Sequence, residues 1–184
     1  MMRCLVHLRD FLHCRRNNPS GPGELRHYVP DLRNHYQETK DILTCQRERL
    51  AAYEKKYSSV PEVPLSTKVH CACQAGYGVG LVIAIVYNCV LSALSPEDGD
   101  LGSDSTAFVS DVLALAKEAR KYRPLGSSFV APCLGAAWVG TTFDNMKLEV
   151  ERVWEEYGGD LVSGLRKLPL TELTWISRQL RLID

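Results

Sequence analysis

The sequence predicts an all-α protein: a compact bundle of about seven or eight helices around a buried central helix. Three observations support this fold class. Apolar residues recur three and four positions apart in most segments, as on one face of a helix. No segment shows the polar and apolar alternation of a half-buried strand. The 184 residues are 45% hydrophobic and 24% charged, a composition typical of one globular domain, which we place at 1–184.

The N-terminal region predicts a short helix followed by a loop. Leu5, Leu8 and Leu12 lie at helical spacing, so we expect a helix over about 3–14. Residues 15–23 concentrate Asn, Pro, Ser and Gly, which are the residues that favour turns. We therefore expect a flexible loop after the first helix.

A long helix is predicted to begin near Asp31, after Pro30. Its seam positions are spaced alternately four and three residues apart: Leu32, Tyr36, Thr39, Leu43, Gln46, Leu50, Tyr53 and Tyr57. One interpretation is a homodimer through a coiled coil. The other is packing on the protein's own core, which we favour because several seam positions are aromatic or polar.

The central helix is predicted over about 67–94, where Val79 to Leu94 carries no charge. A helix that is apolar all round is buried. A membrane span needs about 20 apolar residues, and Gly80, Asn88 and Ser92 interrupt a shorter run here. We therefore predict a core helix and no membrane span.

Three glycines on this helix, Gly76, Gly78 and Gly80, superficially resemble a phosphate-binding loop. A dinucleotide motif needs G-x-G-x-x-G between a strand and a helix, and the third position of that pattern is Leu81 here. We therefore predict a steric role: the glycines let neighbouring helices approach closely or leave room for a ligand.

In the rest of the chain, the spacing of apolar residues predicts five shorter helices, at about 105–122, 127–140, 150–157, 161–168 and 173–182. Arg123-Pro124 ends the first because the residue before a proline avoids the helical region. Pro132 is expected near the first turn of the second, where its missing N–H does little harm.

The charges balance over the whole chain but not over its parts. The formal net charge of zero gives no general attraction to nucleic acid, so we predict no direct nucleic-acid binding. Residues 1–60 contain 11 Lys and Arg against 7 Asp and Glu, whereas 61–184 contain 11 against 15. Ordinary scatter is the interpretation we favour; electrostatic pairing between the two parts, or a weakly basic face, is the alternative.

The seven cysteines predict free thiols in an intracellular, reducing compartment, the cytoplasm or the nucleus. Their number is odd, and residues 1–16 show no apolar signal-peptide core. Cys71 and Cys73, beside His70, form the only close pair, without a second pair at zinc-site spacing, so we predict no metal site. Cys89 and Cys133 lie in apolar stretches and are predicted to fill the core.

The candidate binding residues are polar or aromatic groups in apolar surroundings: His70, Tyr77, Tyr87, Asn88, Arg123 and Trp138. The first four lie on the central helix and the last two are expected near it. Because buried polar groups need partners, these residues form either a satisfied network in the core, which we favour, or the wall of an apolar pocket. No phosphate-loop, nucleophile-elbow or metal motif assigns a catalytic residue or a cofactor.

Two stretches carry a resemblance, YGVGLVIAIVYNCVL at 77–91 and AKEARKYRPLGSS at 116–128. With Ala136–Trp138 and Val150–Tyr157, they resemble segments in the regulatory region of fungal zinc-cluster transcription factors, over roughly residues 35–160. The resemblance implies a helical scaffold with an effector-like apolar pocket. That family reads DNA through an N-terminal six-cysteine zinc cluster, which nothing in this sequence matches.

Two hypotheses follow from the resemblance. In the first, which we favour slightly, a stand-alone scaffold binds a hydrophobic small molecule of fungal secondary metabolism. It would catalyse a cofactor-free cyclisation, such as a cycloaddition of the Diels–Alder type, or an isomerisation, by holding the substrate in a reactive conformation. In the second, the chain is a non-DNA-binding regulatory module that acts through protein partners. The first predicts an enclosed cavity beside the central helix, and the second predicts an exposed apolar patch.

Overall fold

The computed structural model describes residues 26–57, 64–124, 127–158 and 170–180. Within these ranges the protein is all-α and contains no strand. The α-helices are α2 (Val29–Tyr57), α3 (Pro64–Leu94), α4 (Gly99–Ala119), α5 (Ser127–Gly140), α6 (Asp144–Tyr157) and α7 (Leu170–Leu180), with short 3-10 helices η1 (Arg26–Tyr28) and η2 (Arg120–Tyr122). The all-α prediction is confirmed. The predicted count of seven or eight exceeds the six α-helices described, and the predicted helices at 3–14 and 161–168 and the loop at 15–23 lie outside the described residues.

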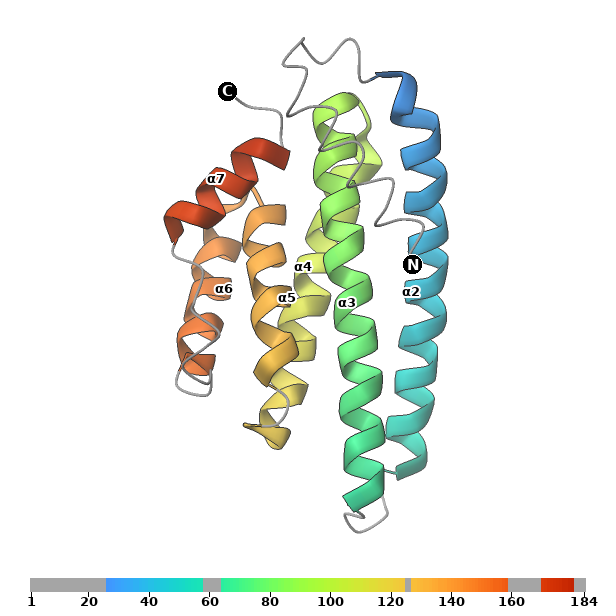
Figure 1. Ribbon diagram of the computed structural model, residues 1–184, viewed down its shortest axis with the longest axis vertical. Helices are drawn as coiled ribbons and strands as arrows, with labels where there is room; N and C mark the ends of the chain where they lie inside the picture. Colours follow the sequence, from blue (N-terminus) through green and yellow to red (C-terminus); the bar gives the residue numbers. More distant parts are fainter. Residues whose placement is uncertain (1–25, 58–63, 125–126, 159–169, 181–184) are drawn as a thin grey trace.

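The central position of α3 organises the bundle (Figure 1). This helix contacts α2, α4, α5 and α7, and α2 follows its whole length on one side. Leu81, Ala84, Val90 and Leu91 on α3 have no exposed surface. The prediction of a buried central helix is therefore confirmed, because α3 is covered by other helices on several sides.

By length and composition alone, the segment Thr67–Leu94 could also cross a membrane. However, 72% of its apolar window is buried inside the protein. The core helix of a soluble protein has the same length, composition and burial, so this single segment is weak evidence for a span.

The seam of α2 faces α3, as the preferred interpretation predicts. Five seam residues are buried in the core: Leu32, Tyr36, Thr39, Leu43 and Leu50. Gly80 explains how close the two helices lie, because a Cβ there would come within 2.8 Å of Leu43 Cδ2. The seam is thus used within one chain.

Three ion pairs join α2 to α4 or to Asp98, the residue that caps the start of α4. Arg33 pairs with Asp98 at 2.6 Å, Lys40 with Asp104 at 2.7 Å and Arg47 with Asp111 at 3.5 Å. The basic residues recur every seven positions, so they lie on one side of α2. These contacts are of the kind that the pairing alternative predicts, between a basic N-terminal part and an acidic remainder.

Gly78 supports close packing on the opposite side of α3 from Gly80. A Cβ at Gly78 would come within 2.8 Å of Cys133 Sγ on α5 and 3.3 Å of Leu115 on α4. At Gly76, by contrast, an added Cβ would meet nothing within 4 Å. The steric role predicted for these glycines therefore holds at two of the three positions.

Two predicted positions near helix starts are corrected by the structure. α4 begins at Gly99, not near Ser105, because the Asp98 side chain accepts a hydrogen bond from the backbone N–H of Asp100 and caps the helix early. Pro132 lies inside α5 rather than in its first turn. The carbonyl that it leaves unpaired belongs to Ser128, an exposed residue at the start of that helix.

Candidate functional site

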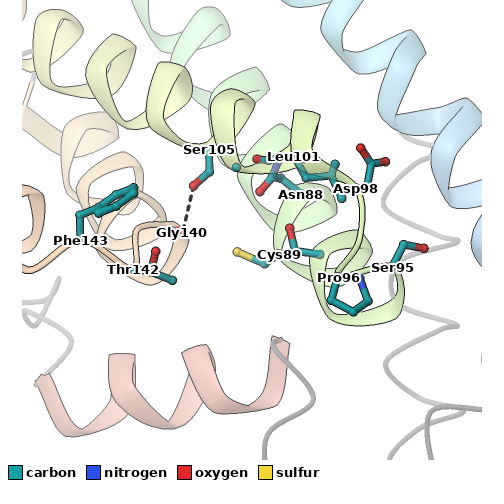
Figure 2. A pocket seen from close by; sticks show the side chains of 13 residues that line it. Asn88, Cys89, Ser95, Pro96, Asp98, Leu101, Ser105, Gly140, Thr142 and Phe143 are labelled. Atoms are coloured by element: carbon teal, nitrogen blue, oxygen red, sulfur yellow. Dashed lines mark hydrogen bonds between the residues drawn. The ribbon is translucent and has the colours of Figure 1, made fainter.

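A hollow of about 320 Å³ lies where the C-terminal part of α3, the start of α4 and the α5–α6 connection meet. Its wall contains Asn88, Cys89 and Ser92 from α3, the α3–α4 turn, residues of the first turns of α4, and Gly140, Thr142 and Phe143. In Figure 2, Asn88 and Cys89 project toward the side on which Ser105, Thr142 and Phe143 lie. The lining is mixed, with hydroxyl and amide groups beside an aromatic ring and aliphatic carbon.

Asn88 is the one predicted site residue in the wall of this hollow, and it is only 3% exposed. Its Nδ2 group donates to the backbone carbonyl of Leu101 at 2.8 Å and to the Tyr36 hydroxyl at 3.1 Å. A carbonyl can only accept, so this contact fixes which way the amide is turned. Both N–H groups are therefore used within the fold, and Oδ1 is the group left for a ligand.

The hydroxyl of Tyr36 connects Asn88 to the ion pairs between α2 and α4. It donates to Asp104 Oδ2 at 2.7 Å, and the same oxygen accepts from Lys40. Burial raises the pKa of the Tyr36 hydroxyl well above its usual value, and the nearby Asp104 carboxylate adds to the increase. Tyr36 therefore stays protonated and holds Asn88 in place.

His70 lies near the opposite end of α3, in a cluster without a free ring nitrogen. Its Nδ1 lies 2.6 Å from the Tyr122 hydroxyl and its Nε2 lies 3.0 Å from Glu54 Oε1. Tyr53 stacks on the imidazole with ring centroids 5.4 Å apart. This cluster is the satisfied network that sequence analysis favoured for the buried polar residues.

Tyr77 and Trp138 are also satisfied within the fold, and Tyr87 is fully buried in the hydrophobic core. The Tyr77 hydroxyl donates to Asp111 at 2.9 Å, and burial, reinforced by that carboxylate, raises its pKa. The Trp138 indole N–H donates to Glu151 at 2.7 Å. None of these three residues lines the described hollow.

Arg123 differs from the expectation of apolar surroundings, because it is exposed. Its guanidinium donates to the backbone carbonyl of Glu156 at 2.7 Å and lies over the Tyr157 ring at 5.1 Å. It therefore connects the end of η2 to the end of α6. The structure does not bring the six predicted residues together into one pocket.

The cysteines of the described core behave as predicted, since Cys89 and Cys133 are 1% and 2% exposed. Burial raises the pKa of the Cys133 thiol to about 12, so it stays protonated. Cys71 and Cys73 are partly exposed and exposed, respectively. Within the described ranges, no group of three or more His, Cys, Asp or Glu side chains is arranged to hold a metal ion.

Sequence reasoning did not identify Gln74, which is 0% exposed. Both polar atoms of its side chain lack a hydrogen-bond partner, as do only two other buried side-chain atoms in the described residues. It lies one turn from His70 and one turn from Gly78, and therefore shares their face of α3. A polar residue in an apolar helix was the available signal, but the sequence could not show that it would be unpaired.

Sequence reasoning also missed Asp98, Ser105 and Phe143 in the wall of the hollow. Asp98 and Phe143 lie in connections between helices, where periodicity carries no information, and Ser105 lies in the second turn of α4. The only signal in the sequence was an aromatic residue, Phe143, directly after two threonines.

No protein-family model, no curated protein and no solved structure matches this chain. The candidate site is therefore defined by its own geometry.

Proposed function

We propose that this protein is a helical scaffold that binds a small organic molecule in the hollow between α3, α4 and the α5–α6 connection. The observation that carries the proposal is Asn88, a buried amide at the wall of the hollow whose donors are used and whose acceptor is free. Small-molecule sites are concave and largely apolar, with a few polar groups that fix the orientation of the ligand, and Asn88 supplies such a group here. The resemblance to an effector-binding regulatory region points to the same kind of role.

The reaction that we propose for such a bound molecule is a cofactor-free cyclisation or isomerisation. Either reaction is balanced within one molecule, because the same atoms appear in substrate and product. The wall supplies groups that orient a substrate: an amide from Asn88 and a hydroxyl from Ser92. The Asp98 carboxylate is engaged by Arg33 and by the start of α4, so it serves as a structural group rather than a general base.

The proposed site differs in form from the one that the sequence predicts. The enzyme hypothesis predicted an enclosed apolar cavity, whereas this hollow is partly open and its wall is mixed. A molecule that fits it has hydrogen-bonding groups as well as an apolar part.

Glycine replacement gives a direct test of the binding site. Gly102 lies in the wall, and an added Cβ there would meet nothing within 4 Å, so Gly102→Leu should fill the hollow without a clash at Cβ. Gly76→Leu is a matched control at another open helical position, outside the wall. A small-molecule library screened by thermal shift should give hits with the wild type and Gly76→Leu that Gly102→Leu loses. Hits that persist in Gly102→Leu would contradict the proposed site.

A second candidate function is a regulatory module that binds a protein partner. The observation that favours it is a pair of exposed valines on α3, Val69 at 42% and Val79 at 46%. Contiguous exposed apolar patches mark protein interfaces, and these two valines are the large apolar side chains that the described part of α3 exposes. This function predicts a copurifying protein that the Val69→Ser/Val79→Ser double variant no longer retains, with small-molecule hits unaffected.

A further inference from the structure

We infer that the hollow accepts neutral or cationic molecules that present a hydrogen-bond donor beside an apolar group, and that it excludes anions. This inference rests on the proposed binding function and specifies the chemical class of its ligand. Three features of the wall carry it: the polarity of Asn88, the charges near the hollow and the position of Phe143.

The first feature is the hydrogen-bonding polarity of Asn88. The fold consumes both N–H groups of its amide, at the Leu101 carbonyl and at the Tyr36 hydroxyl. Oδ1 receives no hydrogen bond from any residue that the structure describes, and an amide oxygen can only accept. Asn88 Oδ1 is not among the buried side-chain atoms that lack a partner in the described residues, so it keeps contact with the open side of the hollow. A ligand that uses this acceptor brings a hydroxyl, an amide N–H or an ammonium group.

The second feature is the charge of the wall. Among the described residues of the wall there is no Lys, Arg or His, and Asp98 is the one charged member. Helix starts usually attract anions, but the start of α4 is already occupied. The Asp98 side chain accepts a hydrogen bond from the backbone N–H of Asp100, and the backbone carbonyl of Asp98 accepts one from the N–H of Leu101. In the described part of the wall, an entering carboxylate or phosphate would meet a carboxylate and no positive side chain.

The nearby cation, Arg33, does not make the wall attractive to anions. Arg33 lies 2.6 Å from Asp98 Oδ2 and is itself outside the wall of the hollow. Its charge is therefore satisfied by Asp98, and the carboxylate is the part of the pair that the wall presents. A cationic ligand gains from this arrangement, whereas an anionic ligand would have to break it.

The third feature is the exposed ring of Phe143, which is 56% exposed although it lines the hollow. It lies across from Asn88 and Cys89 (Figure 2). A planar or aliphatic part of a ligand can cover this ring while its donor group reaches Asn88. This combination defines an amphipathic molecule with separate apolar and donor ends.

Three probes of the same shape test the inference: tyrosol, tyramine and 4-hydroxyphenylacetate. They share a phenol ring and differ in charge, which is zero, positive and negative, respectively, at neutral pH. The probes are titrated into the protein of 184 residues, and the amide signals of Gly102, Gly140 and the Asn88 side chain are followed by NMR. We expect tyrosol and tyramine to bind at least about fivefold more tightly than 4-hydroxyphenylacetate.

A charge-removing variant makes the test specific. Asp98→Asn keeps a good helix cap and removes the Asp98 charge from the wall. It should therefore weaken the binding of tyramine and strengthen the binding of 4-hydroxyphenylacetate, each severalfold. Glu97→Gln removes the charge of the neighbouring residue, which is not part of the wall, and should change neither. A preference unchanged in Asp98→Asn would overturn the role of the wall charge.

The outcomes separate the inference from the proposed function. If none of the probes shifts these signals, the hollow is not a binding site for this class and the proposed function fails with it. Should the anion bind as tightly as the other two, binding in the hollow stands and the ligand class inferred here is wrong.

Discussion

The two ends of α3 each bury a polar side chain, but they differ in what remains free. At one end, both ring nitrogens of His70 are engaged, by Glu54 and by Tyr122. At the other, Asn88 uses its two donors and keeps an unmatched acceptor at the wall of a hollow. A buried polar residue thus indicates a binding site only where the fold does not satisfy all of its groups.

The neighbours of each residue explain this difference. Around His70, side chains from α2 and η2 are long enough to reach both sides of the ring. Near Asn88, α4 begins with Gly99 and contains Gly102, and a Cβ at either position would meet nothing within 4 Å. The hollow exists partly because these two glycines carry no side chain to fill it.

The largest expected effect on stability is at the His70 end of α3. His70→Leu removes both hydrogen bonds and should lower the free energy of unfolding by about 2–3 kcal/mol in urea titrations. Tyrosol binding at the other end of α3 should not change. Glu54→Gln retains an acceptor and removes only a charge on a partly exposed side chain, so its loss should stay below about 1 kcal/mol. Equal losses in the two variants would break the contrast between the two ends.

Between the two ends, α3 alternates tightly packed and open positions. Gly78→Ala places a Cβ 2.8 Å from Cys133 Sγ and should cost about 1–3 kcal/mol of stability. Gly76→Ala adds the same methyl group where nothing lies within 4 Å, and should stabilise the helix by about 0.5–1 kcal/mol. Denaturant midpoints measure both variants. Changes of the same sign would contradict the packing described around these two positions of α3.

Gln74 tests whether an unpaired polar group away from the hollow only lowers the stability of the protein. Replacing its fully buried, unpaired amide by an apolar side chain of similar size, Gln74→Leu, should raise the free energy of unfolding by about 1–2 kcal/mol. Gln74→Glu serves as the opposite control, because an unpaired charge at the same place should destabilise the protein. A destabilised Gln74→Leu would show that the amide has a partner, such as an internal water.

The smallest expected effect concerns the tyrosines that connect α3 and α2 to α4. Burial and a neighbouring carboxylate raise the pKa values of Tyr36 and Tyr77, whereas phenols in the unfolded chain ionise near about pH 10. Their contribution is therefore fully present below about pH 10 and is lost as the pH rises toward the folded-state values. Each hydroxyl should account for about 1 kcal/mol of the stability lost by pH 11.

Urea titrations between pH 8 and pH 11 measure this loss. The Tyr36→Phe/Tyr77→Phe double variant should lose less stability than the wild type over the same interval, although it starts from a lower value. Parallel curves for the two proteins would refute the assignment.

Much of the helical pattern was predictable, because burial imposes a period on the residues that face a core. The seam from Leu32 to Leu50 and the uncharged stretch of α3 both identified buried faces correctly. Helix starts were less predictable, since α4 begins where Asp98 happens to cap it. Of the six predicted site residues, Asn88 alone lines the described hollow, because side chains from other helices decide which polar groups are already paired.

The sequence by itself determined the all-α class, the buried central helix and the glycines that let helices approach, since each follows from local composition and spacing. Only the tertiary structure decided how the charges and polar groups are used. Residues more than 60 positions apart, such as Lys40 and Asp104, become partners because α2 and α4 flank the same helix. For the same reason both ring nitrogens of His70 are paired, whereas Asn88 keeps an unpaired acceptor. Hydrogen bonding depends on distance in space, which the order of residues along the chain does not specify.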